Sequence, residues 1–267
     1  MMERTSLRQT LTGYFVVYLV LESTGRALDG WGFAAGKSAG AIIGLAAAFL
    51  VQAFLLRERN PKRVLLSLGF GRPDMRVLCI SGFVSIALLA TMPFLVAATG
   101  GTFDLPDNWQ LLALSILLLN GIAEETVYRG YLFHRLRKMY TIPKAVVLGT
   151  LLAGAAHVPI VATAGVVVGG LAILVAVLIF LPFATLFERG GNTLWAPATI
   201  HFAADCIIPL GALGLVTPMA IGYWMVAQVL ACYVAALAVS QSPRVPCGTR
   251  GPSPSPSAIH ESRCQTP

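Results

Sequence analysis

Long apolar stretches separated by short polar segments make up most of this chain. Spanning a bilayer takes about 20 apolar residues. Backbone groups inside lipid have to be paired within the chain, so segments that cross are expected to be helices. The pattern predicts an all-α, polytopic membrane protein with about eight transmembrane helices, of which the first and the seventh are short, at about 9–22, 38–56, 77–98, 109–132, 143–161, 164–187, 193–209 and 217–240.

The composition supports the same class of protein. Of the 267 residues, 56% are apolar and only 12% are charged, and the mean hydropathy is +0.75. Soluble proteins carry about twice that charged fraction. The composition therefore excludes an ordinary soluble domain and makes the lipid bilayer the first partner of the chain.

Lysine and arginine are unevenly divided between the polar gaps. The N-terminus, the gaps 57–76, 133–144 and 188–192, and the segment after residue 240 hold almost all of them. The alternate gaps hold only Arg26 and Lys37. Because basic loops stay on the cytoplasmic side, both termini are predicted to be cytoplasmic. The expected location is the bacterial inner membrane. The net charge of +7 is attributed to topology and to anionic lipids, which leaves no role for a nucleic-acid partner.

The sequence divides into a membrane part and a tail. Residues 1–240 form the predicted transmembrane domain. Residues 241–267 are rich in Pro and Ser and poor in apolar residues, so they are predicted to be a disordered cytoplasmic tail. Between the second and third apolar segments, Val64–Leu68 is expected to form a short interfacial helix. In the second segment, small residues four apart offer a face that another helix can approach closely, namely Gly36, Gly40 and Gly44.

Strongly polar residues interrupt the apolar segments at a few positions. Ionisable side chains inside a membrane are costly, usually face the protein interior or water, and point to function. At about 1.5 Å per residue, these groups lie roughly 14–20 Å from the basic end of their helices. They are expected to converge near the midplane on a polar cavity that opens to the cytoplasm. The residues are Glu124, Glu125, His157, His201 and Asp205, with Arg129 four residues after the second acid.

The spacing within each helix indicates which of these side chains share a face. Glu125 and Arg129 are four residues apart, and so are His201 and Asp205. Glu124 is turned from Glu125 by about 100° on an α-helix. We expect Glu125 to pair with Arg129 while Glu124 faces the histidines, with the opposite division left open.

A carboxylate with two histidines suits two kinds of chemistry. A glutamate in a dry pocket can act as a general base on water, and a nearby histidine can orient it or shuttle the proton. Histidine with aspartate can stabilise an oxyanion, provided that the aspartate is protonated or acts through the histidine. The same side chains are also normal zinc ligands. No G-x-S-x-G motif offers a competing nucleophile.

Taken together, these motifs resemble the CPBP (Abi) family, which groups CAAX prenyl endopeptidases with bacteriocin-processing and immunity proteins. The family pattern is E-E-x-x-x-R, F-x-x-x-H and H-x-x-x-N/D, in that order, within an eight-helix membrane fold. Glu124-Glu125 with Arg129, a histidine on the next helix, and the H-x-x-x-D of residues 201–205 follow this order over a motif core of about 60–210. The sequence departs from the pattern at Ala153, where the family has phenylalanine.

The resemblance implies an intramembrane endopeptidase that cleaves a membrane-associated peptide or protein. It implies that Glu124 is the base that activates water and that His157 is its partner. His201 and Asp205 become the pair that stabilises the oxyanion or polarises the substrate. Glu125 and Arg129 would support this geometry.

The sequence leaves more than one possibility for the cofactor and for the activity. The cofactor is either none or a divalent metal such as zinc, which would be held by Glu124, His157 and His201. We favour the metal-free mechanism because no H-E-x-x-H motif fixes a ligand geometry. Two other functions are retained: a catalytically silent family member that acts as a scaffold or in bacteriocin self-immunity, and a proton-coupled transporter.

Overall fold

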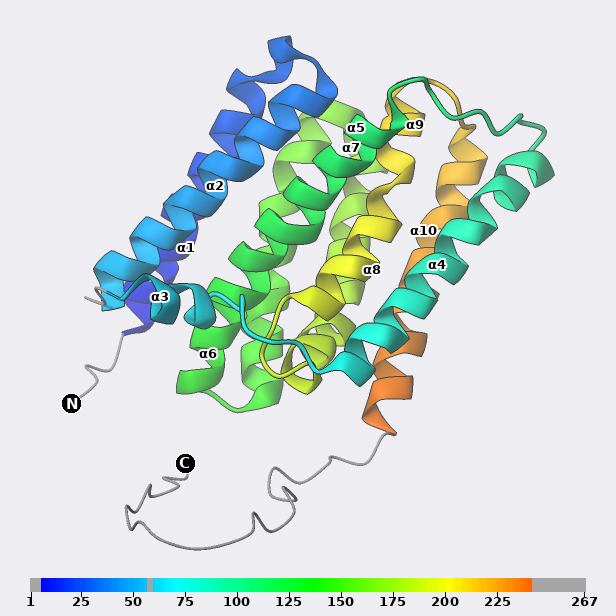
Figure 1. Ribbon diagram of the computed structural model, residues 1–267. Coiled ribbons are helices and arrows are strands. Elements are labelled where there is room, and N and C mark those ends of the chain that lie inside the picture. Colours follow the sequence, from blue (N-terminus) through cyan, green and yellow to red (C-terminus); the bar gives the residue numbers. More distant parts are fainter. Residues whose placement is uncertain (1–5, 57–59, 242–267) are drawn as a thin grey trace, which may run out of the picture.

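The computed structural model describes residues 6–56 and 60–241, and all regular structure within these ranges is helical. The predicted tail, apart from residue 241, lies outside them. Figure 1 shows the helices packed side by side as one bundle. The elements are α1 (Leu7–Ala27), η1 (Asp29–Trp31), α2 (Phe33–Leu56), α3 (Pro61–Ser67), α4 (Met75–Ala98), α5 (Trp109–Ile116), η2 (Leu117–Glu124), η3 (Thr126–Phe133), α6 (His134–Met139), α7 (Ile142–Arg189), α8 (Trp195–Asp205), α9 (Ile207–Ala212) and α10 (Pro218–Ser240).

The all-α membrane fold predicted from the apolar pattern is confirmed. In the described part of the chain, five helical stretches are long and apolar enough to cross a membrane: Phe33–Leu55, Met75–Ala98, Trp109–Met139, Ile142–Arg189 and Pro218–Ser240. The first and seventh predicted segments are helical too, as α1 and α8, but they are not among these five.

Helix α7 accounts for two of the predicted segments. It runs over 48 residues, and Gly165 interrupts it with φ 84° and ψ 167°. Only glycine adopts such a backbone conformation readily. The chain therefore divides here into two arms, which correspond to the predicted segments 143–161 and 164–187.

The two ends of the bundle differ in charge. Elements α3 and α6 lie at one end, together with the start of α1 and the end of α10, and α9 lies at the other (Figure 1). The described basic gaps of the sequence belong to the first end, which we call the basic end. The uneven division of lysine and arginine along the sequence is therefore also a division in space, while the assignment of the basic end to the cytoplasm stays a prediction.

Two local predictions are confirmed in part: Gly40 and Gly44 lie at a close helix contact, and a short helix forms near residues 64–68, while its interfacial position stays a prediction. A Cβ placed on Gly40 would lie 3.4 Å from the Cα of Gly25, and one on Gly44 would lie 2.4 Å from Leu21 Cδ1. The small residues of α2 thus allow close contact with α1. Helix α3 forms where the short interfacial helix was predicted, and its Val64 and the following Leu68 are buried.

The centre of the bundle is a continuous helix from α5 to α6 with widened turns in its middle. Elements η2 and η3 are π-helical, a rare geometry that is frequent at functional sites. Gly121 allows η2 to approach α8, since its Cβ would lie 3.1 Å from the Ala198 carbonyl oxygen. Gly130 packs against the backbone after α3, where a Cβ would lie 2.1 Å from the Leu68 carbonyl oxygen. These contacts hold η2 against α8 and η3 against the backbone after α3, and Glu124 and Glu125 lie at the junction of η2 and η3.

Candidate functional site

The paired acids lie where η2 meets η3, in the middle of the bundle. Glu125 is fully buried, whereas the Glu124 side chain keeps 21% of its surface exposed. Arg129 Nη1 donates to Glu125 Oε1 at 2.7 Å, so the predicted pair is present. The two neighbouring carboxylates are therefore unequal: one is enclosed and paired, and the other is partly accessible.

Arg129 is held by aromatic rings as well as by its acid. Its guanidinium carbon lies 4.9 Å from the ring centre of Phe180 and 4.7 Å from that of Phe183, both on the second arm of α7. The face of an aromatic ring attracts a cation, most strongly away from water. This arrangement keeps the Arg129–Glu125 pair rigid against α7.

His201 of α8 connects the two acids. Its Nδ1 donates to Glu125 Oε1 at 2.7 Å, while its Nε2 lies 3.3 Å from Asp205 Oδ2 and 3.9 Å from Glu124 Oε2. The division is thus less simple than we predicted, because the direct hydrogen bond of His201 goes to Glu125 rather than to Glu124. Both ring nitrogens face carboxylate oxygens.

Asn120 belongs to this cluster and was missed in the sequence. Its Nδ2 donates to Glu124 Oε1 at 3.2 Å and to Asp205 Oδ2 at 2.7 Å, so one amide nitrogen joins η2 to α8. An amide group has two donor hydrogens on that nitrogen. The available signal was a lone polar residue four positions before Glu124 in an otherwise apolar run.

His157, on the first arm of α7, has a different environment. Its Nδ1 lies 2.8 Å from the Ala153 carbonyl oxygen, and its ring stacks on Tyr128 with 6.5 Å between ring centres. A carbonyl oxygen only accepts, so Nδ1 carries a proton and Nε2 is left for another partner. Within the described residues, no hydrogen bond or ion pair joins His157 to Glu124. The aromatic ring beside the histidine comes from Tyr128, in a chain that has Ala153 at the phenylalanine position of the family pattern.

The proposed metal ligands are not gathered around one point. Among the described residues, no group of three or more His, Cys, Asp or Glu side chains could hold a metal ion. The Nδ1 atoms of His201 and His157 are engaged by Glu125 and by the Ala153 carbonyl oxygen, so only their Nε2 atoms are available as ligands. As arranged, these residues do not fit a metal centre, and we derive no step through one.

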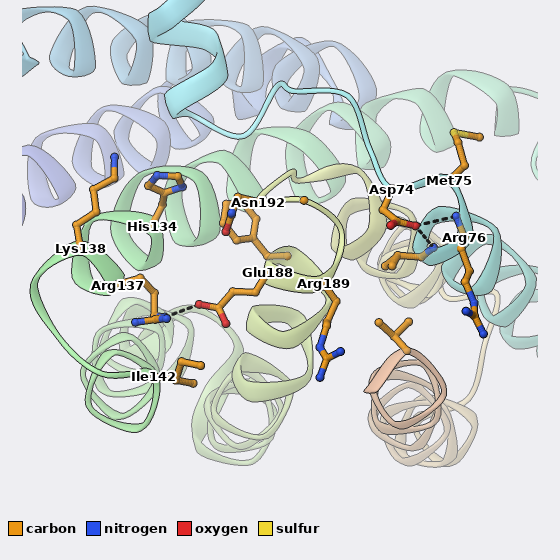
Figure 2. A pocket seen from close by; sticks show the side chains of 14 residues that line it. Asp74, Met75, Arg76, His134, Arg137, Lys138, Ile142, Glu188, Arg189 and Asn192 are labelled. Carbon is orange, nitrogen blue, oxygen red and sulfur yellow. Dashed lines mark hydrogen bonds and ion pairs between the residues drawn. The ribbon is translucent and has the colours of Figure 1, made fainter. Parts of the chain in front are cut away.

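A large cavity lies at the basic end, apart from the acid–histidine cluster. It is an open hollow of about 1050 Å³ between α4, α6, α7 and α10 (Figure 2). None of the clustered residues lines it. Two buried phenylalanines of α7 are one turn apart. Phe187 lines the cavity, whereas the ring of Phe183 lies 5.5 Å from that of His201.

A bundle of long apolar helices that holds three acids, an arginine and two histidines defines an integral membrane protein with a polar site. Residues 106–207 match the model of the family described as type II CAAX prenyl endopeptidase Rce1-like. The match contains every predicted site residue, from Glu124 to Asp205, and confirms the resemblance to the CPBP family in this segment. Because this is a family of proteases, the match supports a peptidase. No match was found among curated proteins or among solved structures.

Proposed function

We propose that this protein is an intramembrane endopeptidase that cleaves a membrane-associated peptide or protein with a water molecule activated by Glu124. One observation carries the proposal. A partly accessible carboxylate lies beside His201 and Asp205 in a segment that matches a protease family. The match supports the reaction class, and the geometry supports the assignment of roles.

Glu124 is a better candidate for the base than its neighbour. The Glu125 carboxylate is fully buried, and its Oε1 already accepts from Arg129 and His201. Glu124 Oε2 lies 3.9 Å from His201 Nε2, beyond hydrogen-bond distance, so it is free to accept from water. A base has to reach the proton that it removes, which favours the accessible carboxylate.

The charge balance of the cluster favours proton uptake. His201 places both nitrogens against carboxylates, an arrangement that suits the doubly protonated imidazolium, because a bare ring nitrogen would face oxygen lone pairs. Three carboxylates then surround two cations, Arg129 and His201. A proton received by Glu124 makes the cluster neutral, which stabilises it inside a membrane.

The reaction can be written with these groups. Glu124 removes a proton from water while the water oxygen bonds to the carbonyl carbon of the scissile amide. The carbonyl electron pair moves to oxygen, and His201 Nε2–H donates to that oxyanion. When the tetrahedral intermediate collapses, the C–N bond breaks and Glu124 returns its proton to the leaving amine. His157, with an unprotonated Nε2, is assigned to orient the water or to carry the proton.

Asp205 and Asn120 are positioning residues in this scheme. The Asp205 carboxylate accepts from Asn120 Nδ2 and lies beside His201 Nε2, so it acts through the histidine and needs no proton of its own. Asn120 offsets the repulsion between Glu124 and Asp205 by donating to both. Removal of the Asn120 side-chain amide is expected to displace the Glu124 carboxylate.

The test compares newly formed peptide termini in membranes from cells that produce the wild-type protein, Glu124→Gln or Glu22→Gln. Glu22 is the matched control, because it forms an exposed pair with Arg26 on α1, away from the cluster. We expect a set of cleavage products that disappears in Glu124→Gln and persists in Glu22→Gln. Identical products from all three membranes would contradict the peptidase assignment and favour a catalytically silent scaffold.

A further inference from the structure

The cavity at the basic end is built from helix ends that are distant in sequence. It is lined by the start of α4, by α6, by the ends of α7 and by the end of α10, with a volume of about 1050 Å³. In the view of Figure 2, Lys138 and Arg76 lie on opposite sides and Arg189 lies between them. A hollow of this size is large enough for a small molecule or a lipid headgroup.

Positive charge predominates in the lining. Four cationic side chains, Arg76, Arg137, Lys138 and Arg189, face two carboxylates there. Both carboxylates already have partners. Asp74 Oδ1 accepts from the backbone N–H groups of residues 76 and 77, and Glu188 pairs with Arg137.

The lining carries a net charge of +2 (four cations against two carboxylates), and three of its cations have no ion-pair partner in the described part of the chain. Within the described residues, no ion pair involves the side chain of Arg76, Lys138 or Arg189. They come from α4, α6 and α7 respectively. Charges of one sign that line one hollow from separate helices create a positive potential that attracts an anion.

The same cavity has an apolar side. Val77 and Val239 are buried in its wall, and Met75 and Ile142 keep 62% and 45% of their surfaces exposed. These exposed side chains lie at ends of membrane-spanning helices, where acyl chains and headgroups meet. The lining therefore suits an anion that carries an apolar part.

We propose that this cavity binds the anionic phosphate headgroup of a phospholipid, with its acyl chains against Met75 and Ile142. The three unmatched cations supply the charge, and basic pockets between transmembrane helices on the positively charged side are suited to anionic headgroups. The inference does not depend on the proposed peptidase activity, because the cavity contains none of the cluster residues. Other cations of the same end, such as Lys62 and Lys144, do not line the cavity.

The experiment measures lipid retained by the purified full-length protein with native mass spectrometry, after titration with phosphatidylglycerol or with phosphatidylcholine of the same acyl chains. Arms with inorganic phosphate separate a lipid from a soluble anion. We expect saturable retention of phosphatidylglycerol, with little retention of phosphatidylcholine. In Arg76→Gln/Arg189→Gln, the affinity for phosphatidylglycerol should fall about 30-fold, which corresponds to about 2 kcal/mol.

The matched control is Lys62→Gln/Lys144→Gln, which removes the same charge from the same end outside the cavity. It should change the affinity by less than about three-fold. Arg76→Lys/Arg189→Lys keeps the charge and should restore most of the binding, which separates charge loss from misfolding. Equal losses in both Gln variants would overturn the site in favour of a general surface attraction. Saturable phosphate binding without retention of phosphatidylglycerol would overturn the lipid assignment.

Discussion

Asn120 donates to Asp205 at 2.7 Å across the contact between η2 and α8, and the same nitrogen donates to Glu124 at 3.2 Å. One neutral side chain thereby holds two carboxylates that would otherwise repel each other. We predict that Asn120→Ala loses most of the proteolytic activity and lowers the free energy of unfolding by about 1–3 kcal/mol. The control is Asn108→Ala, because the Asn108 side chain makes no capping hydrogen bond. Thermal unfolding in detergent, with cleavage measured in parallel, checks both effects.

Substitution by glutamine should mainly lower stability at Glu125 and mainly abolish cleavage at Glu124. Glu125→Gln leaves the buried Arg129 without its carboxylate, so we expect about 3–5 kcal/mol of destabilisation. Glu124→Gln should abolish cleavage while it keeps the unfolding temperature close to that of the wild type, because its carboxylate is partly exposed. Comparable destabilisation by both variants would argue against the separation of base and structural acid.

The contact of Gly130 with the backbone after α3 predicts a strong effect of one methyl group. In Gly130→Ala, the new Cβ would lie 2.1 Å from the Leu68 carbonyl oxygen, and a backbone atom cannot move aside at low cost. We expect destabilisation of about 1–3 kcal/mol or more. Gly82→Ala, at a position with open space around the new Cβ, should stay within about 0.5 kcal/mol. Denaturation of the two variants in the same detergent provides the comparison.

Tyr128 is predicted to hold the ring of His157 in the orientation that the reaction uses. Tyr128→Phe keeps the stacked ring and should retain most of the activity, whereas Tyr128→Leu removes it and should lower the turnover rate more than the substrate affinity. Separate measurement of kcat and KM on a cleaved peptide distinguishes the two effects. Equal activity of Phe and Leu variants would show that the stack does not matter.

The metal-free mechanism predicts that chelators leave the cleavage rate unchanged. Purified protein is incubated with EDTA or with 1,10-phenanthroline, and the cleavage rate is compared with that of untreated protein. A loss that is restored by added zinc, and by no other treatment, would overturn the metal-free assignment and return Glu124 and His201 to the role of ligands.

The apolar pattern predicted the helices because the requirement for backbone pairing in lipid acts on each segment alone. Glu125 with Arg129 was predictable for the same reason, since both residues lie on one helix. The hydrogen bond of His201 to Glu125 was not predictable in this way. The π-helical turns of η2 and η3 have backbone hydrogen bonds that span five residues, which shifts side chains from their α-helical positions. Asn120 was missed because its second partner, Asp205, lies 85 residues away in sequence.

The helix that carries the acids also carries a partner for each of them. Arg129 pairs with Glu125, and Asn120 donates to Glu124, both within one continuous stretch from α5 to α6. His201, the long-range partner, follows Glu125 by 76 residues. We therefore expect that this segment can enter the bilayer with a partner beside each carboxylate, and that the later arrival of α8 adds His201 and completes the site.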